Sequence, residues 1–251
     1  MTRTAAPLPR TRSWSAVQCR ADDLDRFIVD HARPLLDGRR MAGHLADWYY
    51  QRADDVLVVG LRGADWCTVQ SLRADLARVA ADVAEAEHGV DQDRLGPAAP
   101  AEDVFCRGTE LAVTTLAAGD AKLTAATELI MATAHALRMD RPATAAWLGG
   151  GPPAGAALDV RWDRLARTRD HAIVRWTNAV RRARRAAEGQ AEAAPTGDWL
   201  GVWREQLARL LNRLGLTPAE IRALCARTAG ALAVRDPFAA DPLYLDLATA
   251  V

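Results

Sequence analysis

The sequence lacks the residue groups that usually indicate metal, redox or nucleotide chemistry. Its four cysteines are scattered over 251 residues without a C-x-x-C pair, so buried free thiols are expected. The five histidines show no H-E-x-x-H spacing. No G-x-G-x-x-G, P-loop or G-x-S-x-G motif occurs, so nucleotide binding and serine-hydrolase chemistry have no support. We therefore expect neither a metal nor a cofactor.

Net charge and long apolar runs are also missing. The 32 basic side chains balance 32 acidic ones, whereas nucleic-acid binders normally carry a basic excess. No apolar run approaches the roughly 20 residues that span a bilayer. The N-terminal stretch is polar and has no signal-peptide core. We expect a cytoplasmic protein with no nucleic-acid or membrane partner.

What the sequence does contain is mostly helical pattern, because alanine, arginine and leucine dominate. Residues 14–20 alternate like a strand, and residues 44–52 and 56–61 are typical of a hairpin rich in aromatic and β-branched side chains. The pattern predicts an α+β fold, a single domain in which a small, mainly antiparallel sheet packs against several helices.

The domain is expected to occupy residues 13–235. A flexible arm at 1–12 precedes it, a tail at 236–251 follows it, and flexible links lie near 149–155 and 189–197. A domain boundary at the glycine- and proline-rich segment 149–155 is the less favoured alternative, because the helices beyond it are too few for a separate core.

Helical spacing and capping residues predict the helices. One is expected to open at Asp22 or Asp23 and to end at Gly38. The sequence also predicts a short strand at Val104–Cys106. The remaining helices before the C-terminal pair are expected at 68–87, 109–137 (with a break near Gly119-Asp120) and 159–188.

The C-terminal segment predicts a helix pair. Its first helix reaches Asn212-Arg213, and a capping box at Thr217 and Glu220 begins the second. Eight tryptophans against three tyrosines and three phenylalanines are an unusual balance, and two of them lie on this first helix. One face of that helix carries Trp199, Trp203, Gln206 or Leu207, and Leu210.

Three segments carry a family resemblance through their order and spacing: Trp48–Arg52 with 56–63, Glu102 with 105–108, and 207–213 with Glu220. They resemble W-F-F-I-R-Y with H-L-R-L-R-L-R-G, E-x-x-R-Y-G-G, and L-H-M-H-L-N-R of the lantibiotic dehydratase C-terminal domain. That domain also occurs in stand-alone thiopeptide biosynthesis proteins. The resemblance touches most of residues 14–232.

The departures from the family pattern count against glutamate elimination. In dehydratases the domain is implied to eliminate glutamate with hairpin arginines and a histidine on the last helix pair. An enzyme that binds a γ-carboxylate and moves a proton does not readily lose these groups. At the matching positions this chain has Val58, Gly60, Phe105, Ala208 and Leu210.

The resemblance then favours a thiopeptide pyridine synthase without a cofactor. Such an enzyme is implied to join two dehydroalanines in a formal [4+2] aza-cycloaddition, with loss of water and of the leader peptide. Its partner would be a modified precursor peptide with an acidic leader and an azole- and dehydroalanine-containing core, and a homodimer stays open. A glutamate-eliminating dehydratase component and a non-catalytic precursor-binding partner remain as alternatives.

Candidate catalytic residues are Tyr50 as a proton donor, Glu102 as a base or an anchor for a substrate amide, and Asp47 as a weaker candidate. Each has a structural alternative, a sheet aromatic for Tyr50 and a loop carboxylate for Glu102. Aromatic stacking on azole rings is expected of Trp199 and Trp203, with core packing at even odds. The residues predicted to bind substrate are Trp48, Arg52, Trp199, Trp203, Gln206 and Asn212.

A basic cluster lies on the predicted helix before residue 188. A solvated helix face is its usual explanation. The sharper hypothesis is capture of the acidic leader, which should weaken as salt rises. The cluster consists of Arg175, Arg181, Arg182, Arg184 and Arg185.

Overall fold

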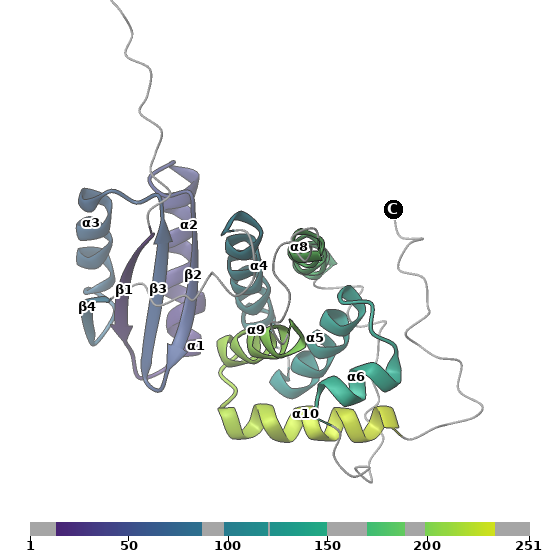
Figure 1. Ribbon diagram of the computed structural model, residues 1–251. Helices are drawn as coiled ribbons and strands as arrows, with labels where there is room; N and C mark the ends of the chain where they lie inside the picture. Colours follow the sequence, from purple (N-terminus) through teal and green to yellow (C-terminus); the bar gives the residue numbers. More distant parts are fainter. Residues whose placement is uncertain (1–13, 87–97, 120, 150–169, 189–198, 234–251) are drawn as a thin grey trace, which may run out of the picture. The chain divides into compact units, whose positions relative to one another are not determined.

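The chain divides into two compact units, residues 1–91 and 92–251, which are described separately. The predicted arm at 1–12, the tail at 236–251, the link at 189–197 and nearly all of that at 149–155 lie outside the described residues. The computed structural model describes residues 14–86, 98–119, 121–149, 170–188 and 199–233 (Figure 1).

Unit 1 alternates strands and helical segments in the order βαββαβ. The first helical segment is one continuous run in which a π-helical turn separates two α-helical parts. The elements are β1 (Trp14–Arg20), α1 (Leu24–Phe27), η1 (Ile28–Ala32), α2 (Arg33–Met41), β2 (Asp47–Ala53), β3 (Val56–Arg62), α3 (Trp66–Leu76) and β4 (Asp82–Ala86).

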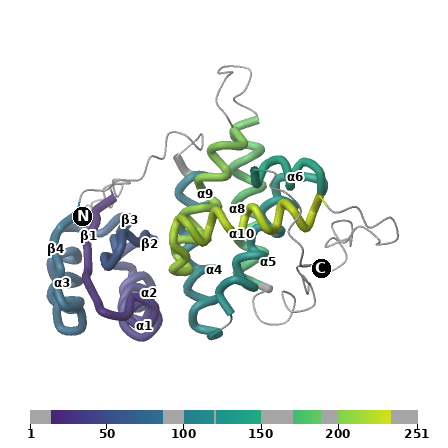
Figure 2. Tube along the Cα trace, turned by 90° about the horizontal axis from the view of Figure 1, so that it is seen from below, coloured from purple at the N-terminus to yellow at the C-terminus, as the bar shows by residue number. Residues whose placement is uncertain are grey.

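The four strands form an antiparallel sheet in the order β2-β3-β1-β4. This is the ferredoxin-like arrangement, in which each helical segment connects two parallel strands that are separated by an antiparallel one. Both helical segments lie on the same side of the strands (Figure 2). The small antiparallel sheet with packed helices confirms the predicted α+β class.

Local signals explain the first helical segment. Asp23 caps it, because its carboxylate accepts a hydrogen bond from the Arg26 amide at 3.0 Å. The predicted end at Gly38 is wrong. The helix continues to Met41, since an exposed helical glycine is tolerated, and Gly43 at φ +74° provides the left-handed residue after the end.

Two further predictions in the middle of the chain are wrong. The helix expected over 68–87 ends at Leu76, and β4 follows it at Asp82–Ala86, where Val83 pairs with Cys19 of β1. The strand expected at Val104–Cys106 is part of a helix. Packing with neighbouring elements overrides local preference in both places.

Unit 2 is helical throughout its described residues. The predicted break between two helices near Gly119 is confirmed, and so is the C-terminal helix pair. Its elements are α4 (Ala98–Ala117), α5 (Lys122–Ala136), α6 (Arg141–Trp147), α8 (Asp170–Glu188), α9 (Trp199–Arg213) and α10 (Pro218–Ala233).

The core of unit 2 forms where α4 packs against α8 and α9, α5 against α8, and α10 against α6 (Figures 1 and 2). Phe105, Trp176, Trp203 and Leu210 are fully buried there. Among the described helices, none is long and apolar enough to cross a membrane.

Candidate functional site

The two faces of the sheet in unit 1 differ in what they contact. Because side chains alternate along a strand, the register divides them into two sets. We call the side that carries α1, α2 and α3 the helix face, and the opposite side the second face. The helix face holds Val17, Cys19, Trp48, Tyr50, Arg52, Leu57, Val59, Leu61, Val83 and Glu85. The second face holds Trp14, Ala16, Gln18, Asp47, Tyr49, Gln51, Val58, Gly60 and Arg62.

Trp48, Tyr50 and Arg52 share one face, as predicted, and it is the helix face. The Trp48 indole donates to Asp37 of α2 at 3.0 Å, and Arg52 donates to Asp25 of α1 at 2.5 Å. Tyr50 is fully buried and stacks with Trp48, with ring centroids 6.3 Å apart. This placement favours packing roles for all three. Their predicted catalytic and substrate-binding roles stay predictions.

The second face carries the other hairpin aromatic, Tyr49. Its ring meets Trp14 of β1 edge to face, with centroids 5.1 Å apart, and the guanidinium of Arg62 lies 6.0 Å from the centre of the Trp14 ring. A guanidinium at this distance is attracted to the negative face of an indole. Two aromatic rings and one cation therefore form a continuous group on the second face.

Gly60 sets the position of the Tyr49 ring. The two residues pair across β2 and β3, and a Cβ atom at position 60 would lie 2.2 Å from Cε1 of Tyr49. The ring thus lies across the backbone of β3, where a side chain would otherwise stand. Gly60 occupies the place of an arginine in the resembling hairpin, so here an aromatic ring takes up that space.

Asp47 also belongs to the second face. Its carboxylate lies 3.7 Å from the guanidinium groups of both Arg40 and Arg62, and it accepts a hydrogen bond from the Trp48 amide at 3.0 Å. Of the two hairpin residues predicted to be catalytic, Asp47 shares a face with the aromatic group and Tyr50 does not.

Sequence reasoning missed Trp14, Tyr49 and Arg62. A signal was available in the resembling motif, whose arginine positions correspond to residues 58, 60 and 62. These positions alternate onto one face of β3, and the short turn of the hairpin brings residues 47, 49 and 51 to the same face of β2. The strand period therefore places Tyr49, and not Tyr50, on the face that carries these arginine positions.

In unit 2, the second and third resembling segments meet where α4 and α9 cross. A Cβ atom at Gly108 would lie 2.6 Å from Nη1 of Arg213, 3.1 Å from the Trp176 ring and 3.7 Å from Leu210. Arg213 is only 2% exposed. The glycine of the second segment thus leaves the space in which the arginine of the third is buried.

The predicted polar residues around this crossing have different environments. Glu102 of α4 is 3% exposed and Gln206 of α9 is 4% exposed, whereas Asn212 is half-buried. Glu128 of α5 is a further buried carboxylate in this unit. Buried carboxylates of this kind need partners that compensate their desolvation.

Trp199 and Trp203 lie on one face of α9, as predicted. Their rings meet edge to face at 5.5 Å, with Trp203 fully buried and Trp199 half-buried. Two other tryptophans of unit 2 have indole partners: Trp147 donates to the Leu200 carbonyl at 2.8 Å and Trp176 to the Thr133 hydroxyl at 3.1 Å.

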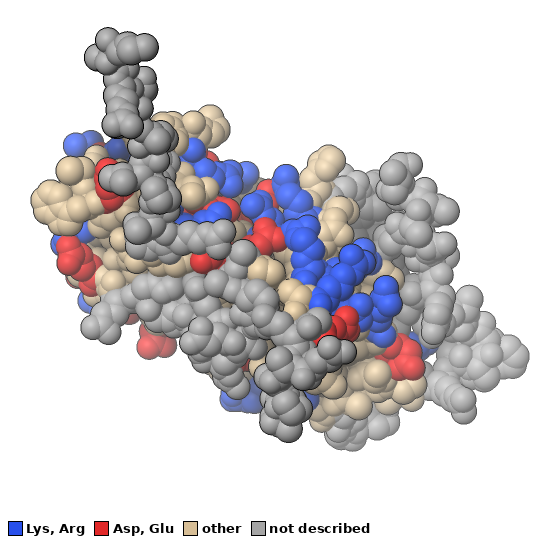
Figure 3. All heavy atoms as spheres, turned by 45° about the horizontal axis from the view of Figure 1, so that its top comes forward, with Lys and Arg blue, Asp and Glu red and all other residues tan. Residues whose placement is uncertain are grey.

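The arginines predicted to capture a leader lie on α8, where acidic side chains of α4 engage two of them. Arg175 pairs with Glu110, and Arg182 pairs with Asp103. Both carboxylates also bind Arg107. Arg184 lies 3.7 Å from Glu188. Figure 3 shows basic side chains gathered on one face with a few acidic side chains beside them. Arg181 and Arg185 complete the predicted set, and Arg185 is exposed.

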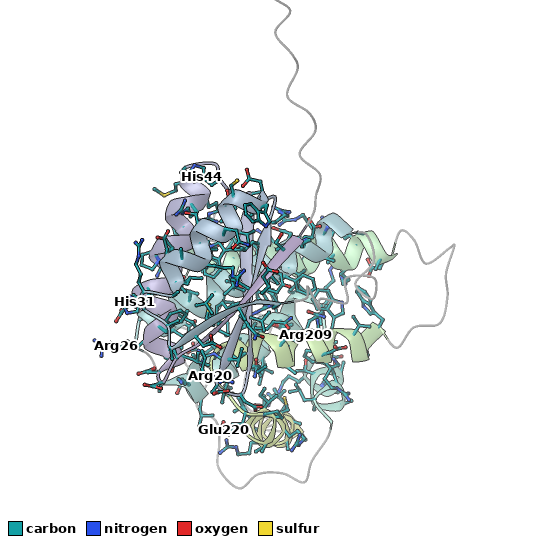
Figure 4. All side chains as sticks on the ribbon, turned by 90° about the vertical axis from the view of Figure 1, so that its left-hand side faces the viewer. Arg20, Arg26, His31, His44, Arg209 and Glu220 are labelled. Carbon is teal, nitrogen blue, oxygen red and sulfur yellow. The ribbon has the colours of Figure 1, made fainter. Side chains whose placement is uncertain are left out.

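Histidines and cysteines do not gather in the described parts of the chain. No group of three His, Cys, Asp or Glu side chains there is arranged to hold a metal ion. His31 and His44 are exposed and lie at separate places on unit 1 (Figure 4). Burial, together with nearby Arg181, lowers the pKa of His135, so this imidazole is neutral near pH 7.

Comparison with known proteins agrees with the resemblance seen in the sequence. The family model described as lantibiotic biosynthesis dehydratase C-term matches residues 14–232. No curated protein sequence matched the chain.

Three solved structures share the fold at low identity. The tRNA-dependent lantibiotic dehydratase MibB from Microbispora sp. 107891 has a TM-score of 0.61 and 19% identity, over 91% of this chain and 28% of that one. The pyridine synthase TbtD from thiomuracin biosynthesis has a TM-score of 0.57 and 18% identity, over 88% of this chain and 97% of that one. TsrL has a TM-score of 0.57 and 16% identity, with coverages of 87% and 94%. The chain therefore spans less than a third of MibB.

Proposed function

Because the chain belongs to the lantibiotic biosynthesis dehydratase C-terminal family, we propose that it is a thiopeptide pyridine synthase. Its substrate would be a precursor peptide that carries azoles, two dehydroalanines and an acidic leader. The reaction would be a formal [4+2] aza-cycloaddition, followed by loss of water and of the leader to give a pyridine macrocycle.

The observation that carries the proposal is the apolar character of five positions where the family's eliminating members have charged or imidazole groups, although Arg62 keeps the third arginine of the matching strand. Phe105 and Leu210 are fully buried, and Gly60 lies beneath the Tyr49 ring. A glutamate eliminase must bind a γ-carboxylate and move a proton, which needs cations and a base. A pyridine synthase acts on a neutral reacting centre, which aromatic and apolar surface suits better.

The chemistry needs no electron acceptor. One dehydroalanine and the iminol form of its preceding amide supply the azadiene, and the alkene of the other dehydroalanine supplies the remaining two carbons. Two C–C bonds form, and water and the leader amide then depart to leave the aromatic ring. Bringing the reacting groups together can supply roughly 7–11 kcal/mol of the barrier in ideal cases.

Proton transfers to the amide oxygen and to the departing groups would fall to positioned side chains. We keep Tyr50, Glu102 and Asp47 as candidates and add Tyr49, whose phenol lies on the second face beside Trp14. Removal of a general acid typically slows a reaction by about 10²–10⁴-fold. Tyr49→Phe is therefore expected to lower turnover more than Tyr50→Phe. Glu102→Gln should also lower turnover. Circular dichroism should show that each variant remains folded.

The deciding experiment combines the purified protein with a dehydrated, azole-containing precursor. Mass spectrometry should show a pyridine macrocycle and a released leader amide. The absence of both products overturns the proposal. Release of glutamate from a glutamylated precursor would identify an eliminase instead, and binding without either reaction would identify a precursor-binding partner.

We also propose that the leader binds at the arginines of α8. Arg175 and Arg182 already pair with acids of α4, so a leader would have to compete for them. Arg185→Glu should weaken leader affinity, and rising salt should weaken it further. Arg20→Glu, at the exposed end of β1 in unit 1, is the matched control and should leave leader affinity unchanged.

A further inference from the structure

The indole N–H of Trp203 is a hydrogen-bond donor without an acceptor in its surroundings. The side chain is fully buried in unit 2, and within the described part of the chain no acceptor lies in hydrogen-bond reach of Nε1. Most buried polar atoms in proteins have a partner, so each exception needs an explanation. Leaving such a donor unpaired destabilises a fold.

The other buried tryptophans of unit 2 show that the fold otherwise satisfies its indoles. Trp147 donates to a backbone carbonyl of α9, and Trp176 donates to a threonine hydroxyl of α5. An indole has one donor and no acceptor, and its ring fixes the direction of the N–H. Among the tryptophans of unit 2 that the structure describes, Trp203 is therefore the buried one whose donor remains available.

The neighbour of Trp203 suggests what accepts this donor. Trp199, one turn earlier on α9, meets Trp203 at 5.5 Å and 82° and is half-buried, so part of its ring is accessible. An accessible aromatic surface next to an unpaired donor fits a flat heteroaromatic ring that carries a hydrogen-bond acceptor. Thiazole and oxazole rings have this character, since their ring nitrogen is an acceptor and their faces stack on indole.

We infer that Trp203 donates a hydrogen bond from Nε1 to an azole nitrogen of the peptide, while Trp199 packs against the same ring. This inference rests on the proposed function, because it takes the azole-containing peptide as the ligand. It makes Trp203 a specificity-determining residue that distinguishes an azole from a phenyl ring of similar shape. Because Nε1 is shielded from solvent, this contact requires a neighbouring side chain to move when the azole enters.

Substitution of two tryptophans by phenylalanine provides the test. Trp203→Phe removes the available donor, and Trp147→Phe makes the same chemical change where the donor already has a protein partner. The probe is a synthetic peptide with two consecutive thiazoles, measured by calorimetry against a matched peptide with phenyl rings. Trp203→Phe should weaken thiazole-peptide binding by about tenfold, the loss of one hydrogen bond, and leave phenyl-peptide binding unchanged. Trp147→Phe should leave both affinities within about twofold.

A second measurement uses the unaltered protein and so does not depend on how the variants fold. The ¹⁵N–¹H spectrum should contain eight indole signals, one for each tryptophan, and the signal absent in Trp203→Phe identifies Trp203. Addition of the thiazole peptide should move that proton downfield, as a new hydrogen bond does, and the phenyl peptide should not.

The outcomes separate this inference from the proposed function. Equal thiazole-peptide affinity in wild type and Trp203→Phe, an unmoved indole signal, or no binding of the thiazole peptide each overturns the inference. Macrocycle formation would still support the proposed function in any of these cases. Conversely, thiazole binding that depends on Trp203, without any macrocycle, supports the inference and counts against the synthase.

Discussion

At the scale of single residues, Gly60 decides where the Tyr49 ring lies. A methyl group at position 60 would come within 2.2 Å of the ring and must displace it from the backbone of β3. Gly60→Ala should therefore lower the free energy of unfolding by about 1–3 kcal/mol, the usual effect of overpacking. Urea unfolding followed by circular dichroism measures this change.

Gly38 provides the matched control for this substitution. It lies inside α2, its φ is not positive, and no atom lies within 4 Å of a Cβ placed there. Gly38→Ala should raise the free energy of unfolding by about 0.5–1 kcal/mol, because alanine favours helix. If both variants shift the urea midpoint in the same direction, the close approach of Tyr49 to Gly60 is not the cause.

The cysteines differ in their access to solvent, which gives a second residue-scale prediction. Burial, with a smaller effect of Asp82, raises the pKa of the Cys19 thiol to about 12, whereas Cys67 is exposed. The thiolate is the reactive form. A thiol reagent at pH 8 should modify Cys67 at once and Cys19 only after denaturation, as peptide mass mapping can show. Early labelling of Cys19 would contradict the burial of β1.

The raised pKa of Cys19 also sets a direction for alkaline stability. The folded state keeps the proton to a higher pH than the unfolded state, whose thiol pKa is near 9.0. The contribution is fully present below that pH and is lost as the pH rises toward about 12. Cys19→Ala should flatten this part of the stability curve.

The hairpin shows how far residue choice can be predicted from sequence. The pairing of aromatic and β-branched runs was enough to predict β2 and β3, and their alternation put Trp48, Tyr50 and Arg52 on one face. Which face the helices cover depends on the strand order, a non-local property. The sequence therefore predicted the grouping correctly, but it could not show that this group faces the helices.

At the scale of elements, the capping box at the start of α10 is the sharpest local signal. The Thr217 amide and hydroxyl both donate to the Glu220 carboxylate at 2.8 Å, and the Glu220 amide donates back to the hydroxyl at 3.2 Å. The hydrogen bond from the Thr217 amide, and to a smaller extent that from its hydroxyl, lowers the pKa of Glu220 below 4.5. The cap is thus stabilising above that pH and is lost as the pH falls through the lowered pKa.

Glu220→Gln tests this pH dependence. The variant should be less stable than wild type at pH 7, and the difference should shrink as the pH falls through the lowered pKa of Glu220. Hydrogen exchange of the first α10 amides reports the effect directly, because the end of the helix opens without global unfolding. Exchange that is equal in both proteins at pH 7 would mean that Glu220 does not hold the helix end.

The elements that sequence reasoning missed share a physical cause. The stretch that forms β4, Asp82–Ala86, is rich in alanine and glutamate and favours helix, yet it pairs with the edge of β1. Val104–Cys106 has strand propensity but lies in α4, which is buried by both α8 and α9. A helix covered on two sides loses the one-sided apolar stripe on which helical periodicity depends. Strand pairing with β1 therefore determines the structure of residues 82–86, and burial between helices determines that of residues 104–106.

At the scale of the whole molecule, each compact unit has its own core. In unit 1, two helical segments pack on one face of the four-stranded sheet. In unit 2, Phe105, Trp176 and Leu210 are buried among the helices. Domains of this size commonly fold alone. The fold therefore favours two independent folding units, residues 1–91 and 92–251.

Expression of the two fragments separately tests this independence. Fragments 1–91 and 92–251 should each unfold cooperatively in urea, because the cut between them divides neither a strand pair nor a helix pair. A cut between Asp54 and Asp55 is the control. It separates β2 from β3 inside the hairpin, so neither resulting fragment should show a cooperative transition. Fragment 1–91 becoming structured only after fragment 92–251 is added would show that the two units form one cooperative domain.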